Sequence, residues 1–173
     1  MSTAIVVAFF VFFCVRLSSL FISIKNERRL KQAGAQEYGN LNTTILAVLH
    51  VVFYLGAFAE GYVNRVQFDQ KTVIGIGIYV FSLVMLFYVI RQLSPIWTVK
   101  LIIAKDHPLN KSFIFRSIRH PNYLLNIIPE LIGLALVMKS YVVLLTVFPV
   151  YLVSLGVRIV QEEKQMRSRF EDY

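Results

Sequence analysis

Five consecutive residues, Arg119-His120-Pro121-Asn122-Tyr123, combine a cation, an imidazole and a proline at the start of an apolar run. Pro121 suits the first turn of a helix, where its missing N–H costs no hydrogen bond. The free backbone N–H groups of that turn and the positive end of the helix dipole favour an anionic ligand group. The pentad therefore predicts a binding site at a helix start. An Arg that reaches lipid headgroups beside a Pro that only begins a helix is the simpler alternative.

Three further charged residues accompany apolar runs after the pentad. Glu130 follows Pro129 inside an apolar stretch, where a carboxylate needs a partner. Arg158 and Glu162 are four residues apart, so on a helix they share a face and are expected to pair. An ordinary ion pair that caps the last span is the structural alternative to a functional role for these two residues.

The composition places these residues in a membrane protein. Of 173 residues, 57% are hydrophobic and 16% are charged, whereas a soluble domain is about one quarter charged. The net charge of +8 does not indicate nucleic-acid binding, because the basic residues lie in short loops between apolar runs. The single cysteine, Cys14, argues against a disulfide framework and a cysteine-based metal site, and we expect no metal.

Apolar runs of spanning length predict an all-α integral membrane protein with about five transmembrane helices. We expect a single membrane domain over residues 1–173, without a separate soluble domain. The expected spans cover residues 3–24, 43–63, 72–93, 122–138 and 141–157. The last two spans are joined only by Lys139-Ser140, so they form a tight antiparallel hairpin. Residues 158–173 are expected to form a tail helix that leaves along the membrane surface.

Several residues within or beside the spans invite specific predictions. Arg16 is expected to reach the interface by extending its side chain, with a buried ion pair as the alternative. His50 is expected to hydrogen-bond between helices, and Glu60 lies near enough to a span end to reach water. Trp97 resembles an interface anchor. Glycines at positions 75 and 77 are expected to permit close helix contact.

The distribution of Lys and Arg predicts the topology. Fourteen of these residues fall in the loop after the first span, in the segment before the fourth, and in the tail, whereas three fall on the opposite side. This asymmetry places the N-terminus outside and the C-terminus in the cytoplasm. The segment 100–123 and the tail then lie on one side of the membrane, and the hairpin makes Tyr123 a neighbour of Arg158. We expect one polar pocket there, at the cytoplasmic rim of the bundle.

Two motifs at this separation resemble the isoprenylcysteine carboxyl methyltransferase family of membrane methyltransferases. The first is the pentad, and the second is Arg158-Ile159-Val160-Gln161-Glu162-Glu163 after the apolar hairpin. The segment from Arg28 to Gly39 resembles short bacterial members. The resemblance is strongest from Trp97 to the end of the chain. It implies S-adenosylmethionine as cofactor, held in a cytoplasm-facing pocket without a Rossmann fold, and a lipophilic methyl acceptor.

The resemblance also implies roles for individual residues. It assigns Arg158 to catalysis and substrate binding, and we add Glu130 as a second substrate-binding candidate. The implied cofactor contacts are His107, Pro108, Leu109, Asn110, Phe115, His120, Pro121, Asn122, Tyr123 and Glu162. The chain departs from the family where Phe113 and Phe115 replace Gly and Tyr and where Leu125 replaces Gly, although Phe115 can still stack on adenine.

The predicted activity is O-methyl transfer to a carboxyl, enol or phenol oxygen of a small lipophilic or prenylcysteine-like substrate. Methyl transfer from a sulfonium is an in-line displacement, so alignment and charge placement dominate catalysis. The two-pronged guanidinium of Arg158 is suited to bind an acceptor oxygen, and the Glu162 carboxylate is suited to bind ribose hydroxyls or an amino group.

A membrane reductase of the sterol-reductase architecture and a non-catalytic scaffold or transporter are the alternative functions. The expected partners are the lipid bilayer and the lipophilic substrate. The protein would lie in the bacterial plasma membrane or the eukaryotic endoplasmic reticulum, in an unknown oligomeric state.

Overall fold

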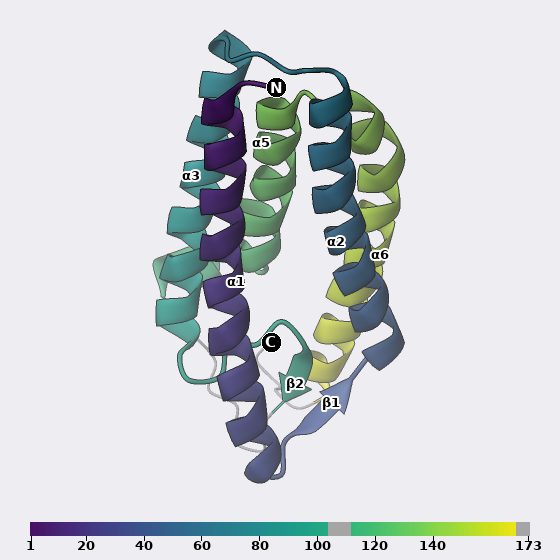
Figure 1. The fold of residues 1–173 in the computed structure, drawn as a ribbon. Coiled ribbons are helices and arrows are strands. Elements are labelled where there is room, and N and C mark those ends of the chain that lie inside the picture. Colours follow the sequence, from purple (N-terminus) through teal and green to yellow (C-terminus); the bar gives the residue numbers. More distant parts are fainter. Residues whose placement is uncertain (104–111, 169–173) are drawn as a thin grey trace.

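The computed structural model describes residues 1–103 and 112–168, which form a bundle of long helices with a small two-stranded sheet at one end (Figure 1). The elements in chain order are α1 (Thr3–Gln32), β1 (Gln36–Tyr38), α2 (Asn40–Val63), α3 (Gln70–Leu93), β2 (Leu101–Ile103), α4 (Phe113–Ser117), the π-helical turn η1 (Asn122–Ile127), α5 (Ile128–Met138) and α6 (Tyr141–Arg167). Four of these helices, α1, α2, α3 and α6, are long and apolar enough to cross a membrane, and η1 with α5 forms a shorter apolar helix. The prediction of an all-helical membrane bundle is confirmed.

Two of the helices run further than the predicted spans. α1 continues past residue 24 to Gln32, and α6 continues past residue 157 to Arg167 without a break. The predicted tail helix and the fifth span are therefore one helix over the described residues. The two-residue connection Lys139-Ser140 makes α5 and α6 the expected tight hairpin.

The closest helix contact joins α3 to α5 through two glycines. A Cβ atom added at Gly75 would lie 2.8 Å from the backbone nitrogen of Val137. One added at Gly133 would lie 2.8 Å from the backbone nitrogen of Tyr79. Because backbone atoms cannot move aside as a flexible side chain can, only glycine fits at both positions. The prediction of close contact is confirmed for Gly75. It is wrong for Gly77, because a Cβ atom added there would have no heavy atom within 4 Å outside the backbone of its own helix.

At the end of the bundle that carries the N-terminus, charged side chains cap helix starts. The Glu60 carboxylate accepts hydrogen bonds from the backbone nitrogens of Val142 and Val143, each at 3.0 Å, and so caps α6. Asp69 accepts a hydrogen bond from the backbone nitrogen of Thr72 at the start of α3 and another from Lys139 Nζ at 2.7 Å. These bonds fix both loops at this end.

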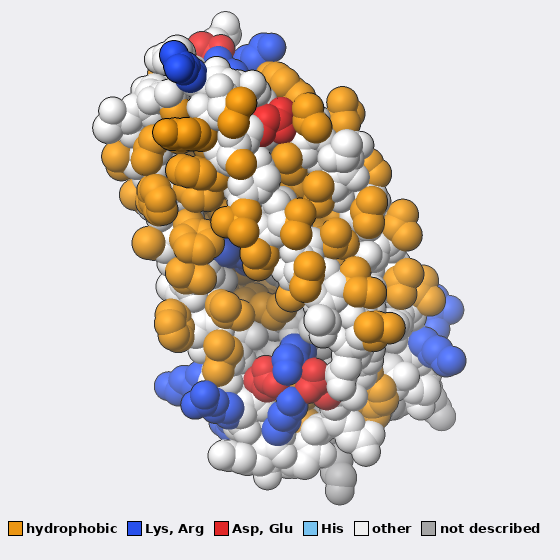
Figure 2. Space-filling view, turned by 45° about the vertical axis from the view of Figure 1, so that its right-hand side comes forward, with side chains coloured by type: hydrophobic (Ala, Val, Ile, Leu, Met, Phe, Trp, Pro, Cys, Tyr) orange, Lys and Arg blue, Asp and Glu red, His pale blue; other side chains and the backbone are white. Residues whose placement is uncertain are grey.

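At the opposite end, the strands β1 and β2 pair antiparallel with Glu37 opposite Ile102. The sequence predicted only a chain break near Gly34 and Gly39, because a three-residue strand is too short to show alternation. Both glycines adopt left-handed backbone conformations. Acidic and basic side chains gather at this end in Figure 2. They include the ion-paired residues Glu27, Lys31, Glu37 and Lys100.

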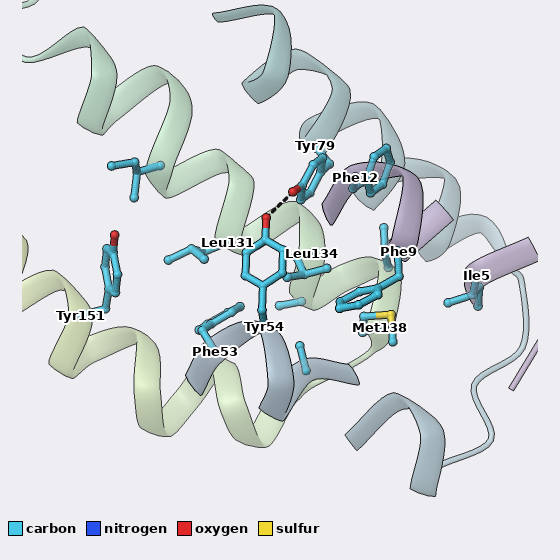
Figure 3. Packing of buried hydrophobic residues seen from close by; sticks show 14 of the residues in the cluster. Ile5, Phe9, Phe12, Phe53, Tyr54, Tyr79, Leu131, Leu134, Met138 and Tyr151 are labelled. Carbon is cyan, nitrogen blue, oxygen red and sulfur yellow. Dashed lines mark hydrogen bonds between the residues drawn. The ribbon is translucent and has the colours of Figure 1, made fainter. Parts of the chain in front are cut away.

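The core is aromatic and contains buried polar groups. Figure 3 shows Tyr54 of α2 and Tyr79 of α3 joined through their hydroxyls, with Phe12 beside Tyr79. Arg16 Nε lies 3.2 Å from Glu130 Oε1. The prediction that Arg16 extends to the interface is therefore wrong. The fully buried Glu130 carboxylate attracts the guanidinium, because an unpaired charge there would be costly.

Candidate functional site

A cavity of about 200 Å³ lies at the end of the bundle that carries the sheet. It is enclosed by residues from the end of α3 and the following loop, from β2, from α4 and η1, and from α6. Its polar and aromatic lining comprises Trp97, Thr98, Lys100, Phe115, Arg119, His120, Asn122, Tyr123, Arg158 and Glu162. The predicted pocket between the pentad and the tail is therefore present as a cavity.

The centre of the cavity wall is a three-residue relay from two helices. The Tyr123 hydroxyl donates to Glu162 Oε2 at 2.6 Å and accepts a hydrogen bond from Arg158 Nε at 3.4 Å. The direct ion pair expected between Arg158 and Glu162 is not found among the ion pairs of the described residues. Tyr123 bridges them instead, because the hairpin brings η1 against the face of α6 that both residues share.

The Arg158 guanidinium is held on three sides. Besides the Tyr123 contact, Nη1 donates to Thr43 Oγ1 of α2 at 2.7 Å, and Nη2 donates to the carbonyl oxygen of Val99 at 3.1 Å. Arg158 is only 4% exposed. Since these partners come from α2, the loop before β2, and η1, the plane of the guanidinium is fixed by three separate elements. A planar cation held this way is suited to orient an oxygen in the cavity.

The local helix geometry places the pentad at the cavity. Pro121 opens the helix with a φ of −63°, as the sequence predicts. The chain then forms the π-helical turn η1, a feature that often marks functional sites. Pro129 follows one turn later and has no N–H to donate to the carbonyl of Leu125. This missing helix bond is a physical reason for the wide turn just before α5.

His120 is buried against two carboxylates of α6. Its Nε2 atom lies 3.5 Å from Glu163 Oε1, and its Nδ1 atom lies 3.9 Å from Glu162 Oε1. The imidazole stacks on the ring of Tyr123 with centroids 5.6 Å apart. Arg119 is exposed and lies 3.9 Å from Glu163 Oε1. His120 therefore connects the pentad to Glu162, which lines the cavity, and to the neighbouring Glu163.

The structure brings together most of the predicted site residues. Those that line the cavity are Phe115, His120, Pro121, Asn122, Tyr123, Arg158 and Glu162. His107, Pro108, Leu109 and Asn110 lie outside the described residues. Glu130 does not line this cavity. It lies deeper in the bundle, beside Arg16 and His50.

Sequence reasoning missed the contribution of Trp97. The prediction of an interface anchor is wrong, since Trp97 is 4% exposed and lines the cavity. It packs with Leu86, Val89 and Ile90 of α3. Its Nε1 atom is buried and has no hydrogen-bond partner among the described residues. The only sequence signal that Trp97 lines the cavity was its position just before the polar segment 100–123. A tryptophan that anchors a span at the interface would occupy the same position.

The lining defines what the cavity can hold. It offers aromatic faces, an unpaired indole N–H, a carboxylate from Glu162 and a guanidinium from Arg158. A ligand with a flat ring, hydroxyl or amino donors and a nearby anionic oxygen would satisfy these groups.

Comparisons with known proteins give a consistent result. The model of the isoprenylcysteine carboxyl methyltransferase (ICMT) family matches residues 73–168. An uncharacterized protein of Haemophilus influenzae is 47% identical over 156 residues, which cover 90% of this chain and 91% of that protein. The uncharacterized protein YpbQ of Bacillus subtilis is 25% identical over 153 residues, which cover 88% of this chain and 90% of that protein. No solved structure matches the chain.

Proposed function

The chain belongs to the isoprenylcysteine carboxyl methyltransferase family, and we propose that it is an S-adenosylmethionine-dependent O-methyltransferase of a lipophilic substrate. The observation that carries the proposal is the relay of Arg158, Tyr123 and Glu162 in the wall of the cavity. It puts a fixed cation and an anion on one helix face, one turn apart. Such a pair of charges can hold the cofactor through the anion and orient the acceptor oxygen through the cation, and this alignment favours an in-line methyl transfer.

The residues of the cavity fit the cofactor. The buried Trp97 Nε1 atom lacks a partner, and the Glu162 carboxylate has a second oxygen that can accept from a ribose hydroxyl or an amino group. Phe115 and Tyr123 offer ring faces for adenine. When bound, S-adenosylmethionine supplies a methyl group activated by a sulfonium. The family's cofactor residues among 107–110 belong to this proposal by resemblance alone.

Arg158 is proposed to orient the acceptor oxygen. A carboxylate acceptor needs no general base, so fixing its direction is the main task left to the protein. Hydrogen bonds to Thr43 and Val99 keep the guanidinium from turning away. Carboxylate, enolate and phenolate oxygens all suit this contact, and an enol or phenol must first lose its proton.

The active site is proposed to face the cytoplasm at the rim of the membrane. Support comes from the charge asymmetry, because the polar end with the sheet carries the cationic loops and tail. There, a water-soluble cofactor can enter from one side while a substrate arrives from the bilayer.

A methyl-transfer assay tests the proposal. Purified protein is incubated with S-adenosylmethionine labelled in the methyl group and with a total bacterial lipid extract, and label in the organic phase is counted. We expect wild-type protein to transfer label and Arg158→Lys to transfer at least about tenfold less, because the planar fork is lost. Arg167→Lys, an exposed change on the same helix, is the matched control and should retain activity. No protein-dependent label in the lipid phase would contradict the proposal.

A further inference from the structure

A second polar cluster lies deeper in the bundle than the cavity. Glu130 Oε1 lies 3.2 Å from Arg16 Nε and 3.4 Å from His50 Nε2, and it accepts a hydrogen bond from the Tyr54 hydroxyl at 2.6 Å. His50 Nδ1 lies 3.4 Å from the Tyr151 hydroxyl. Four helices, α1, α2, α5 and α6, therefore contribute to one cluster within the apolar part of the protein.

This cluster and the cavity are built on the same helix faces. α2, α6 and the continuous segment of η1 and α5 each contribute one residue to the cavity region and another, seven residues away, to the deeper cluster. The pairs are Thr43 and His50 on α2, Tyr123 and Glu130 on η1 and α5, and Arg158 and Tyr151 on α6. On α2 and α6, seven residues are close to two α-helical turns, which return a side chain to the same face about 10 Å further along the axis. The cluster thus forms a second polar layer about 10 Å from the relay.

The deeper cluster has unused hydrogen-bonding capacity. Arg16 Nη1 and Glu130 Oε2 are both buried, and neither has a hydrogen-bond partner among the described residues. Asn126, one turn before Glu130, likewise leaves its buried Oδ1 atom without a partner. Buried polar atoms in native structures almost always have a partner. These atoms therefore indicate a group that fills the site.

The two unpaired atoms of the ion pair define the chemistry of that group. Arg16 Nη1 can only donate, and Glu130 Oε2 can accept. A carboxylate ligand would meet the Glu130 charge, and an ammonium would meet the Arg16 charge, at a depth where such repulsion is costly. A neutral hydroxyl satisfies both atoms, because it accepts one hydrogen bond and donates another.

The cluster is reachable from the lipid-facing side. Arg16 keeps 17% of its side chain exposed although its partner Glu130 is fully buried. Figure 2 shows the apolar face hollowed about halfway along the bundle, with a basic side chain inside the hollow.

We propose that Arg16 and Glu130 bind a neutral hydroxyl group of the lipophilic methyl acceptor, about 10 Å from the oxygen that receives the methyl group. This inference rests on the proposed function and narrows its substrate class to molecules with two polar groups, one at the cavity and one within the apolar part. The Tyr54 hydroxyl donates to the first oxygen of Glu130, and Arg16 and His50 also lie beside that oxygen, which leaves the second oxygen for the ligand.

A pair of fatty acids tests the proposal. The probes are 10-hydroxydecanoic acid and decanoic acid, which differ only by a terminal hydroxyl. Their flexible chain is long enough for that hydroxyl to span the distance of about 10 Å between the two layers. Binding is followed by the fluorescence of Trp97, which lines the cavity and is the sole tryptophan. Titrations are run with and without S-adenosylhomocysteine. We expect the hydroxylated acid to bind about five- to tenfold more tightly than decanoic acid.

Variants assign the preference to the cluster. Glu130→Leu removes the hydrogen-bond acceptor, so it should abolish the preference for the hydroxylated acid while S-adenosylhomocysteine still binds. The double variant Arg16→Met/Glu130→Leu removes both charges together with their hydrogen-bonding groups, so it leaves no unpaired charge to disturb folding and should give the same result. Glu60→Gln changes a carboxylate outside the cluster, at the α6 cap, and should keep the preference.

Three results would overturn the proposal: equal binding of the two acids by wild-type protein, no binding of either acid, or a preference that survives in the double variant. The first would mean that water alone fills the cluster. The titration with S-adenosylhomocysteine tests the proposed function independently of the fatty acids. If S-adenosylhomocysteine does not bind, the proposed function is contradicted. The preference for the hydroxylated acid is still measured in titrations that contain no S-adenosylhomocysteine.

Discussion

At the scale of single residues, Tyr123 connects Arg158 and Glu162, two charged residues of α6. Its hydroxyl contacts both Glu162 and Arg158, while its ring stacks on His120. The four-residue spacing of Arg158 and Glu162 indicates that they share a face, but it carries no information about a third side chain between them. Only the position of η1 against α6 reveals the relay.

Substitutions of Arg158 and Glu162 should separate kinetically. Arg158→Lys keeps the charge but cannot reach Tyr123, Thr43 and Val99 together, so we expect turnover to fall about tenfold or more with cofactor affinity nearly unchanged. Glu162→Gln removes the charged acceptor, so cofactor affinity should fall first, by roughly 10- to 150-fold.

Turnover and cofactor affinity are measured for both variants, and thermal stability reports any loss of the Arg158 contacts. If the relay through Tyr123 serves only to join η1 to α6, both variants should be mild and similar in turnover and cofactor affinity. That outcome would remove Arg158 from the catalytic residues.

At the scale of elements, the contact between α3 and α5 is expected to be the least tolerant of substitution. Gly133→Ala would place its Cβ atom 2.8 Å from a backbone nitrogen, so we expect a loss of about 1–3 kcal/mol in the free energy of unfolding. Gly77→Ala is the matched control, since its Cβ atom would meet no atom within 4 Å. Thermal unfolding in detergent compares them. Equal midpoints for the two variants would show that the helices separate easily.

The loop before α3 should respond to pH through Asp69. The hydrogen bond from Lys139, followed by that from the Thr72 backbone, lowers the pKa of Asp69 to about 2. A carboxyl whose folded-state pKa is depressed stabilises the protein above its unfolded value of about 3.9, and this contribution is lost as the pH falls towards the folded-state pKa.

Asp69→Asn should therefore have a lower unfolding midpoint than wild type at neutral pH. We expect the difference to stay constant down to a pH of about 5 and to shrink between roughly 4 and 2. Asn keeps the ability to cap α3, so the change isolates the charge that Lys139 contacts. A difference that does not vary with pH would assign the effect to the cap alone.

At the scale of the whole molecule, the charge asymmetry and the bundle predict the orientation. Figure 1 shows the N-terminus at one end of the bundle and the sheet at the other. A reporter fused after Tyr173 should read cytoplasmic, and one fused before Ser2 should read external. If both reporters lie on one side, the number of spans is even, and the cytoplasm-facing pocket is wrong.

The sequence predicted the bundle because membrane spans depend on composition over about 20 residues, a signal that needs no knowledge of neighbours. It predicted that Tyr123 and Arg158 would be neighbours because Lys139-Ser140 leaves room only for a hairpin. It failed where partners from other helices decide the outcome. Arg16 is drawn inward by Glu130, Trp97 is enclosed by α3, and Tyr123 enters between Arg158 and Glu162.

The central claim, that the cavity between the pentad and α6 holds S-adenosylmethionine, is tested most directly by calorimetry with S-adenosylhomocysteine on the detergent-purified protein. We predict saturable one-site binding to wild type and a roughly 5- to 150-fold weaker affinity for both His120→Ala and Tyr123→Ala, as expected for the loss of one polar contact. Tyr62→Ala, an exposed tyrosine near the end of α2, should bind like wild type. No saturable heat at millimolar ligand, or unchanged affinity in both pentad variants, would contradict the account.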